Sequence, residues 1–157
     1  MIDGRALAAH VTGAGPLAKA LEQRGVRAGE PEEALVLDAG ASAPGSWEEL
    51  EAGLLGAYRL SRRALAAGAP TIYVLDGAAL FGHAPPLHAA LASALLGGAR
   101  SLAAEGERHG IPTHVVTVGR DDAGDGPSEV VEWLLRSAPP TGQLLHCDPT
   151  HVGRPAL

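Results

Sequence analysis

Asp76 and His88 are the residues whose types and places in this sequence could form an acid–base site. A carboxylate that orients an imidazole is a common device for general acid or base catalysis. Asp76 follows an apolar run, and His88 opens a long helical segment. The alternative interpretation is that Asp76 is a turn residue before Gly77, and that His88 is a helix-start residue hydrogen-bonded in an interface.

Other patterns that could bind a ligand are weaker. In Thr12-Gly13-Ala14-Gly15, backbone N–H groups next to a helix N-terminus could hold a phosphate, although a tight strand-to-helix turn explains the same residues. His83 with His88, or His146-Cys147-Asp148 with His151, offers metal ligands without a recognised zinc spacing. We therefore expect no metal site.

The composition excludes several classes of function. The 157 residues carry a formal net charge of −6, and their arginines are scattered, which argues against a nucleic-acid-binding surface. No segment suits a signal peptide or a membrane span. One cysteine excludes an internal disulfide framework, so we expect a cytoplasmic protein. The excess of arginine, alanine and glycine over lysine is typical of a GC-rich bacterial source.

Strand-like and helical segments alternate along the chain. The expected strands are 6–12, 34–38, 71–75, 113–118 and 142–146, and the expected helices are 16–24, 46–66, 87–108 and 127–136. This alternation predicts one domain over 1–157, an α/β fold with a doubly wound parallel sheet and helices on both faces. Only eight residues, 26–33, separate Gly25 from the next strand, whereas a βαβ unit needs roughly 30. A second strand is therefore expected only as a stub.

Two of these helices are expected to form an assembly surface. Residues 84–99 contain no charged side chain, so the helix at 87–108 lacks a solvated polar face and should be buried on several sides. Small residues on this helix and on 46–66 would let helices approach closely. We expect a homo- or hetero-oligomer built through both helices. The candidate interface residues are Leu54, Ala57, Ser61, Leu91 and Leu95.

Several short motifs, taken in order, resemble the short-chain dehydrogenase/reductase family. They are Leu37-Asp38-Ala39-Gly40, Gly53-Leu54-Leu55-Gly56, Arg100-Ser101-Leu102-Ala103, His109-Gly110-Ile111 and Thr141-Gly142-Gln143. The resemblance implies a Rossmann-like fold, here truncated in the N-terminal half. It also implies a four-helix dimer interface made by the helices at 46–66 and 87–108.

The resemblance also implies where catalytic residues would stand, and this sequence has replaced them. The family's catalytic Asn, Ser, Tyr and Lys fall on Gly53, Asp76, His88 and Ala92. The family mechanism needs a tyrosine whose pKa is lowered by a nearby lysine. Neither tyrosine of this chain is followed four residues later by a lysine, and the single lysine is distant in sequence. We expect no family-type catalysis.

Cofactor binding is expected to be lost as well. Gly13, Gly15 and Asp38 are the residual positions of the family's NAD(P) site, in a loop several residues shorter than the family pattern. In the family, the residue that binds the adenosine ribose stands at the end of the second strand, which is expected here only as a stub. Our leading hypothesis is a non-catalytic subunit or scaffold, possibly assembled with an active full-length dehydrogenase. The alternatives are an enzyme that uses Asp76 and His88, and a module that binds a nucleotide or an acyl thioester.

Overall fold

The computed structural model describes residues 7–13, 15–119, 125–137 and 139–147. Its six strands form one parallel sheet in the order β2-β1-β3-β4-β5-β6. The strands are β1 Ala8–Val11, β2 Arg27–Ala28, β3 Leu35–Ala39, β4 Thr71–Asp76, β5 Thr113–Val118 and β6 Leu144–His146. The helices are α1 Pro16–Gln23, α2 Trp47–Ala67, α3 Gly77–Leu80, α4 Pro86–Glu107 and α5 Asp125–Ser137. No helix in these described ranges is long and apolar enough to cross a membrane.

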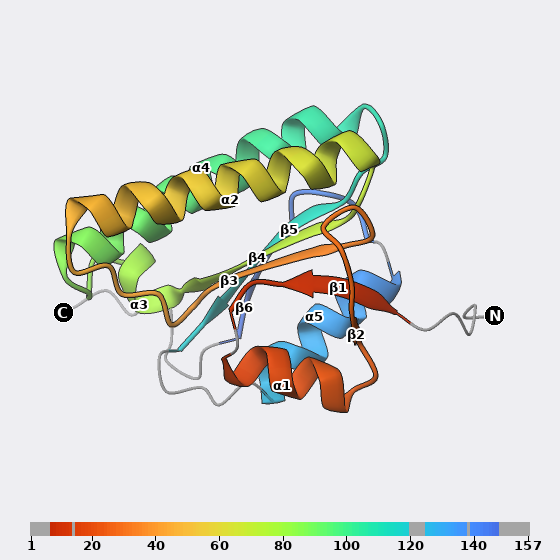
Figure 1. The fold of residues 1–157 in the computed structure, drawn as a ribbon, viewed down its shortest axis with the longest axis horizontal. Coiled ribbons are helices and arrows are strands. Elements are labelled where there is room, and N and C mark those ends of the chain that lie inside the picture. The colour runs from red at the N-terminus through yellow and green to blue at the C-terminus, as the bar shows by residue number, and fades with distance from the viewer. Residues whose placement is uncertain (1–6, 14, 120–124, 138, 148–157) are drawn as a thin grey trace, which may run out of the picture.

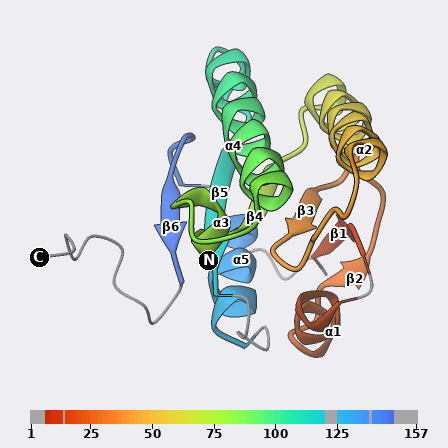
Figure 2. The same ribbon diagram turned by 90° about the vertical axis from the view of Figure 1, so that its left-hand side faces the viewer.

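The helices cover both faces of the sheet, so the predicted doubly wound α/β fold is confirmed. The long helices α2 and α4 lie side by side over one face, and α1 and α5 lie over the other (Figures 1 and 2). The chain runs from β1 outward to β2 and then returns to β3 on the other side of β1. This reversal of strand order places a topological switch point between β1 and β3, where ligands bind in open α/β sheets.

Each face of the sheet has its own apolar core, because successive side chains of a strand point to opposite faces. Val36, Val74 and Val116 pack with Leu21 of α1 and Leu134 of α5. Their strand neighbours form the second core under α2 and α4, with Leu37, Tyr73, Leu75 and Val115 as its strand members. The three central strands are buried almost throughout, as the continuous apolar runs at 35–37 and 71–75 indicate.

The N-terminal half of the sheet is shortened as the sequence predicts. Between β1 and β3 the described residues form only α1 and β2, and β2 is a pair of exposed residues that bonds to β1 alone. Eight residues after Gly25 leave no room for a further helix and strand. The edge of the sheet next to β1 therefore lacks a complete βαβ unit.

Local capping explains where the long helices start and end. Ser46 accepts a hydrogen bond from the Glu49 N–H (3.2 Å), and the Glu49 carboxylate accepts one from the Gly45 N–H (2.7 Å). Ser46 and Glu49 thus form a capping box, although its second bond comes from the N–H of Gly45 rather than from that of Ser46. Gly68 ends α2 with φ of 74°, a left-handed conformation that glycine adopts without strain. The short helix α3 was not predicted.

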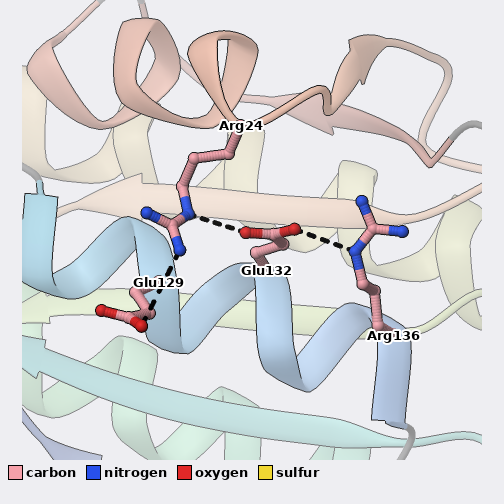
Figure 3. A network of polar contacts seen from close by, with 4 residues as sticks. All are labelled: Arg24, Glu129, Glu132 and Arg136. Atoms are coloured by element: carbon pink, nitrogen blue, oxygen red, sulfur yellow. Dashed lines mark hydrogen bonds and ion pairs between the residues drawn. The ribbon is translucent and has the colours of Figure 1, made fainter.

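An ion network joins α1 to α5 on the outer side of the sheet (Figure 3). The carboxylate of Glu132 accepts hydrogen bonds from Arg24 (2.7 Å) and Arg136 (2.9 Å), and Arg24 also lies 3.9 Å from Glu129. The two arginines hold the pKa of Glu132 below its ordinary value. Because Arg24 follows α1, this network fixes the end of that helix to α5.

Replacing Glu132 with Gln will lower the free energy of unfolding at pH 7 by about 1 kcal/mol, because a neutral amide loses two charge-assisted bonds. The pKa of Glu132 is lowered by folding, so its contribution is present above the ordinary glutamate pKa and is lost as pH falls through the lowered value. Urea unfolding at pH 7 and at about pH 3 checks this, since the stability difference between the two proteins should be smaller at the lower pH. A difference that is equal at both pH values would contradict it.

Candidate functional site

The carboxyl ends of β1, β3 and β4 bring most of the sequence-predicted site residues to one edge of the sheet. Parallel strands end at the same edge, so the loop after β1, Asp38 of β3 and Asp76 of β4 all lie there. His88 lies in the first turn of α4, and the short helix α3 connects the carboxyl end of β4 to α4. This edge is the natural place for a ligand in an open α/β sheet.

Asp38 is held against the loop that precedes α1. Its backbone N–H donates to Thr12 Oγ1 (2.8 Å), and its Oδ1 accepts from the Gly40 N–H (3.1 Å). A Cβ added to Gly15 would lie 3.7 Å from Asp38 Oδ2, so the carboxylate lies beside the residue that caps α1. A negative charge already stands where a helix N-terminus would otherwise attract a phosphate.

Burial raises the pKa of Asp38, and the hydrogen bond from Gly40 opposes part of this effect. A raised pKa means that the folded state disfavours the ionised carboxylate relative to the unfolded chain. Ionised Asp38 therefore costs stability at neutral pH. The cost disappears as pH falls through the raised value towards the ordinary aspartate pKa.

Asp38→Asn will raise the melting temperature at pH 7, because it removes a partly buried charge while its Oδ1 can still accept the Gly40 N–H bond. The gain should vanish at about pH 3, where Asp38 is protonated in both states. Thermal unfolding of the two proteins across this pH range measures the effect. A lower melting temperature for the variant at pH 7 would show that the charge is stabilising, against this prediction.

Asp76 caps α3 and is almost fully buried, with 3% of its surface exposed. Its Oδ1 accepts hydrogen bonds from the N–H groups of Ala78 (2.9 Å) and Ala79 (3.3 Å). Aspartate is a preferred N-cap residue, so Asp76-Gly77-Ala78-Ala79 contains a recognisable helix start rather than a plain turn. The carboxylate thus has a structural role at this position.

Of the other three positions that correspond to the family's catalytic residues, only His88 has a side chain that can exchange a proton. Gly53 has no side chain, and a Cβ there would face Leu91 of α4 at 3.8 Å. Ala92 is buried, with 5% of its surface exposed. His88 is partly buried, as its predicted place at the helix start implies, and its backbone N–H donates to the Pro85 carbonyl (3.0 Å). Among these positions only Asp76 and His88 bear groups that exchange protons.

The residues assigned to an assembly surface lie mainly on the inner sides of α2 and α4. Ala57, Ser61, Leu91 and Leu95 are at most 7% exposed in the single chain, and Leu54 is partly buried against the same core. Packing against the sheet uses these side chains, because the inner faces of both helices must cover Tyr73, Leu75 and Val115. A surface for a second polypeptide would be formed by the outer faces of the two helices.

Three surface hollows lie away from Asp76 and His88. The largest, about 640 Å³, lies where α2 and α4 end, and one of about 370 Å³ lies beside β1, β2 and α1. The third, about 250 Å³, lies between α2 and α4. None of these three hollows, which the described residues form, is lined by Asp76 or His88. Within the described chain no group of three or more His, Cys, Asp or Glu side chains could hold a metal ion; Asp148 and His151 lie outside it.

A buried pair of hydroxyls under the third hollow was not found from the sequence. Ser61 Oγ and Tyr73 Oη are 2.6 Å apart, and both residues are buried. Burial raises the pKa of Tyr73, and the bond to Ser61 opposes this, so the phenol is neutral at physiological pH. No local pattern connects a helix residue to a strand residue 12 positions later, so only the packed fold brings them together.

Comparison with known proteins agrees with this architecture. The sequence matches no protein-family model, and it has no significant match among curated proteins. A dehydrogenase/reductase from Sinorhizobium meliloti 1021 is similar in structure, with a TM-score of 0.68 at 16% identity over 92% of this chain and 94% of that chain. The TT0495 protein from Thermus thermophilus gives 0.68 at 18% identity, over 90% and 96%.

A short chain dehydrogenase from Mycobacterium avium gives a TM-score of 0.60 at 20% identity, over 83% of this chain and 55% of that chain. These likenesses show that the chain has the fold of short-chain dehydrogenases. The predicted Rossmann-like architecture is therefore confirmed, and its length accords with a shortened version of that fold.

Proposed function

We propose that this chain is a non-catalytic subunit or scaffold with the short-chain dehydrogenase fold, which assembles through α2 and α4. The observation that carries the proposal is the state of the four catalytic positions. Gly53 and Ala92 offer no reactive group, and the Asp76 carboxylate caps α3. Without a Tyr–Lys pair the fold lacks the proton donor that the resembled family uses to reduce a carbonyl.

The edge between β1 and β3 supports the further proposal that NAD(P) is not bound. Pro16 begins α1 and has no N–H to offer a phosphate, and Gly15 caps the helix without a side-chain bond. Asp38 adds a negative charge beside Gly15, which would repel a pyrophosphate. Because a full βαβ unit does not form between β1 and β3, the residues that would contact the adenosine of NAD(P) have no strand to position them.

The outer faces of α2 and α4 support assembly. Three of the large apolar side chains that are exposed in the chain, Trp47, Leu55 and Tyr58, belong to α2. The exposed positions in the middle of α4 carry small residues, among them Ala94, Gly97 and Gly98. Exposed aromatic and aliphatic side chains next to a smooth helix face are typical of a protein–protein surface. The occupant is either another copy of this chain or an active full-length dehydrogenase.

The first test is to purify the tagged protein gently from its own host and to measure its intact mass, its composition and its binding of NADH and NADPH. A stoichiometric complex or oligomer without nucleotide binding is the expected result. A monomer that binds NAD(P)H saturably and turns over a substrate would overturn the proposal. We propose the cytoplasm as its compartment, because the single cysteine cannot form an internal disulfide.

An enzyme that uses Asp76 and His88 is the second candidate, favoured by the joint location of these residues at the carboxyl edge. His88→Ala should abolish such activity and leave assembly unchanged, whereas a scaffold should be indifferent to it. A third candidate is a module that binds a nucleotide or an acyl thioester at the edge near Asp38 and Asp76. Titration with NADH and with acetyl coenzyme A distinguishes it, since a flat response to both removes it.

A further inference from the structure

Two of the surface hollows meet where α2 and α4 end, and together they form one cleft. Both helices run in the same direction and end at the amino edge of the sheet, opposite the edge that carries Asp38 and Asp76 (Figure 1). The larger hollow, about 640 Å³, lies at the helix ends, and the smaller hollow, about 250 Å³, lies between the helices. Arg62, Leu65 and Glu105 line both, so the two hollows join at these side chains.

The smaller hollow has apolar walls and room for a ring. Leu54 of α2 and Leu95 and Leu102 of α4 belong to its lining, and Gly98 adds no side chain on the α4 side. Its volume exceeds the roughly 150 Å³ of an apolar cavity that binds benzene in another protein. A single aromatic ring therefore fits between the two helices.

The lining of the smaller hollow also contains the buried hydroxyl pair of Ser61 and Tyr73. Two hydroxyl groups carry two hydrogens, and the bond between these oxygens uses only one of them. Among the described residues neither hydroxyl has another hydrogen-bond partner, so one O–H can donate to a ligand. Burial raises the pKa of Tyr73, which keeps its phenol protonated. The hollow thus suits a ring that carries an accepting oxygen.

Where the hollows join, the cleft presents two opposite charges. Arg62 lies on α2 and Glu105 on α4, and neither side chain has a hydrogen bond or an ion pair with another described residue. A carboxylate is the preferred partner of the Arg62 guanidinium. An ammonium suits Glu105 and the negative ends of both helices, whose last turns carry no basic residue. A ligand with both charges therefore matches this junction better than an anion or a cation.

We propose that this cleft binds a free aromatic α-amino acid. The ring enters the smaller hollow, the carboxylate binds Arg62, and the ammonium faces Glu105 and the helix ends in the larger hollow. A ring hydroxyl, as in tyrosine, accepts the hydrogen bond that the Ser61–Tyr73 pair can donate. This inference goes beyond the proposed function, because it concerns a small ligand at the amino edge of the sheet and does not depend on assembly.

Titration of the full chain with phenylalanine, phenethylamine and hydrocinnamate tests the two charges, since each analogue keeps the ring and only one charge. Calorimetry should show saturable binding of phenylalanine and about tenfold weaker binding of each analogue. Arg62→Gln should remove the advantage of phenylalanine over phenethylamine, and Glu105→Gln its advantage over hydrocinnamate. Arg59→Gln, exposed on α2 outside both hollows, is the control that should change neither. An analogue that binds the wild type as tightly as phenylalanine overturns the assignment.

Two neighbouring glycines of α4 test the position of the ring. A Cβ at Gly97 or at Gly98 meets nothing within 4 Å, so leucine at either position should leave the chain folded, but only Gly98 lines the smaller hollow. Gly98→Leu should weaken phenylalanine binding by about tenfold or more, because the new side chain fills the space for the ring. Gly97→Leu should leave binding unchanged. Circular dichroism verifies folding, and equal binding by the two variants overturns this placement of the ring.

A double substitution tests the hydroxyl pair. Ser61→Ala/Tyr73→Phe removes both hydroxyls together and leaves no buried polar atom without its partner, so the fold should tolerate it. The wild type should bind tyrosine about threefold or more tightly than phenylalanine. The double variant should lose this preference and keep its affinity for phenylalanine. A preference for tyrosine that survives in the double variant contradicts the role of the pair.

Mass and titration together separate this inference from the proposed function. A chain that binds phenylalanine saturably, yet forms neither an oligomer nor a complex in its host, keeps the site and overturns the assembly. A folded chain that assembles, yet gives a flat titration with both phenylalanine and tyrosine at millimolar concentration, overturns the site and keeps the assembly.

Discussion

His114→Leu will raise the free energy of unfolding by about 1–3 kcal/mol at pH 7, and by more at pH 5. His114 is 2% exposed on β5, and neither of its ring nitrogens has a hydrogen-bond partner among the described residues. By strand alternation its side chain faces the same core as Val116, where leucine can pack without an unpaired polar atom. Urea unfolding at the two pH values gives the comparison.

The pH dependence follows from burial, which lowers the pKa of His114. The unfolded chain binds the proton more readily than the folded chain, so stability is lost as pH falls below the ordinary histidine pKa of about 6.5. His114→Leu should remove this part of the acid loss. His109→Gln, at an exposed position after α4, is the matched control and should leave the profile unchanged. A wild type as stable at pH 5 as at pH 7 would contradict the argument.

Gly40→Ala will lower the free energy of unfolding by about 1–3 kcal/mol, because a Cβ there overpacks the core. The added atom would lie 2.6 Å from Val118 Cγ2, and Val118 is a stiff β-branched residue with only 7% exposure. Val118→Ala also destabilises when it is made alone, but it creates the space that the new methyl needs. The double variant should therefore lose less stability than the sum of the two single losses, and strict additivity would contradict the clash.

Gly40 also illustrates how packing alone can account for one residue of a motif. It stands in the Leu37–Gly40 motif that resembles the dehydrogenase pattern, yet its neighbours are Val118, Val74 and the carboxylate of Asp38. The close approach of Gly40, which follows β3, to Val118 at the end of β5 is sufficient to require glycine at this position. The glycine of this motif therefore reflects the packing of the fold and carries no information about a cofactor.

The sequence predicts the fold well because its signals are local. The buried runs of β3, β4 and β5 and the Ser46 cap each lie within a few residues, so their positions follow from pattern alone. The eight residues of 26–33 limit what can form between α1 and β3, and that limit predicts β2 as a stub. The four-residue helix α3 was missed because one turn shows no apolar periodicity, although Asp76 is a suitable cap.

The candidate site is harder to predict because its contacts are between distant segments. The position of Asp38 beside Gly15 and the bond between Ser61 and Tyr73 depend on how strands and helices pack. The faces of α2 were also ambiguous, since Leu54 turns inward and Leu55 outward while both are apolar. Only the crossing of α2 over the sheet decides which of these side chains a second molecule can reach.

The lengths of the outermost strands bear on how this sheet avoids aggregation. The sheet ends in β2, with two residues, and in β6, with three. Edges this short present few unpaired backbone groups, and Arg27 adds a positive charge to one of them. Both features hinder strand-to-strand joining between molecules. The two short edges thus make the rim of this sheet a poor template for fibres.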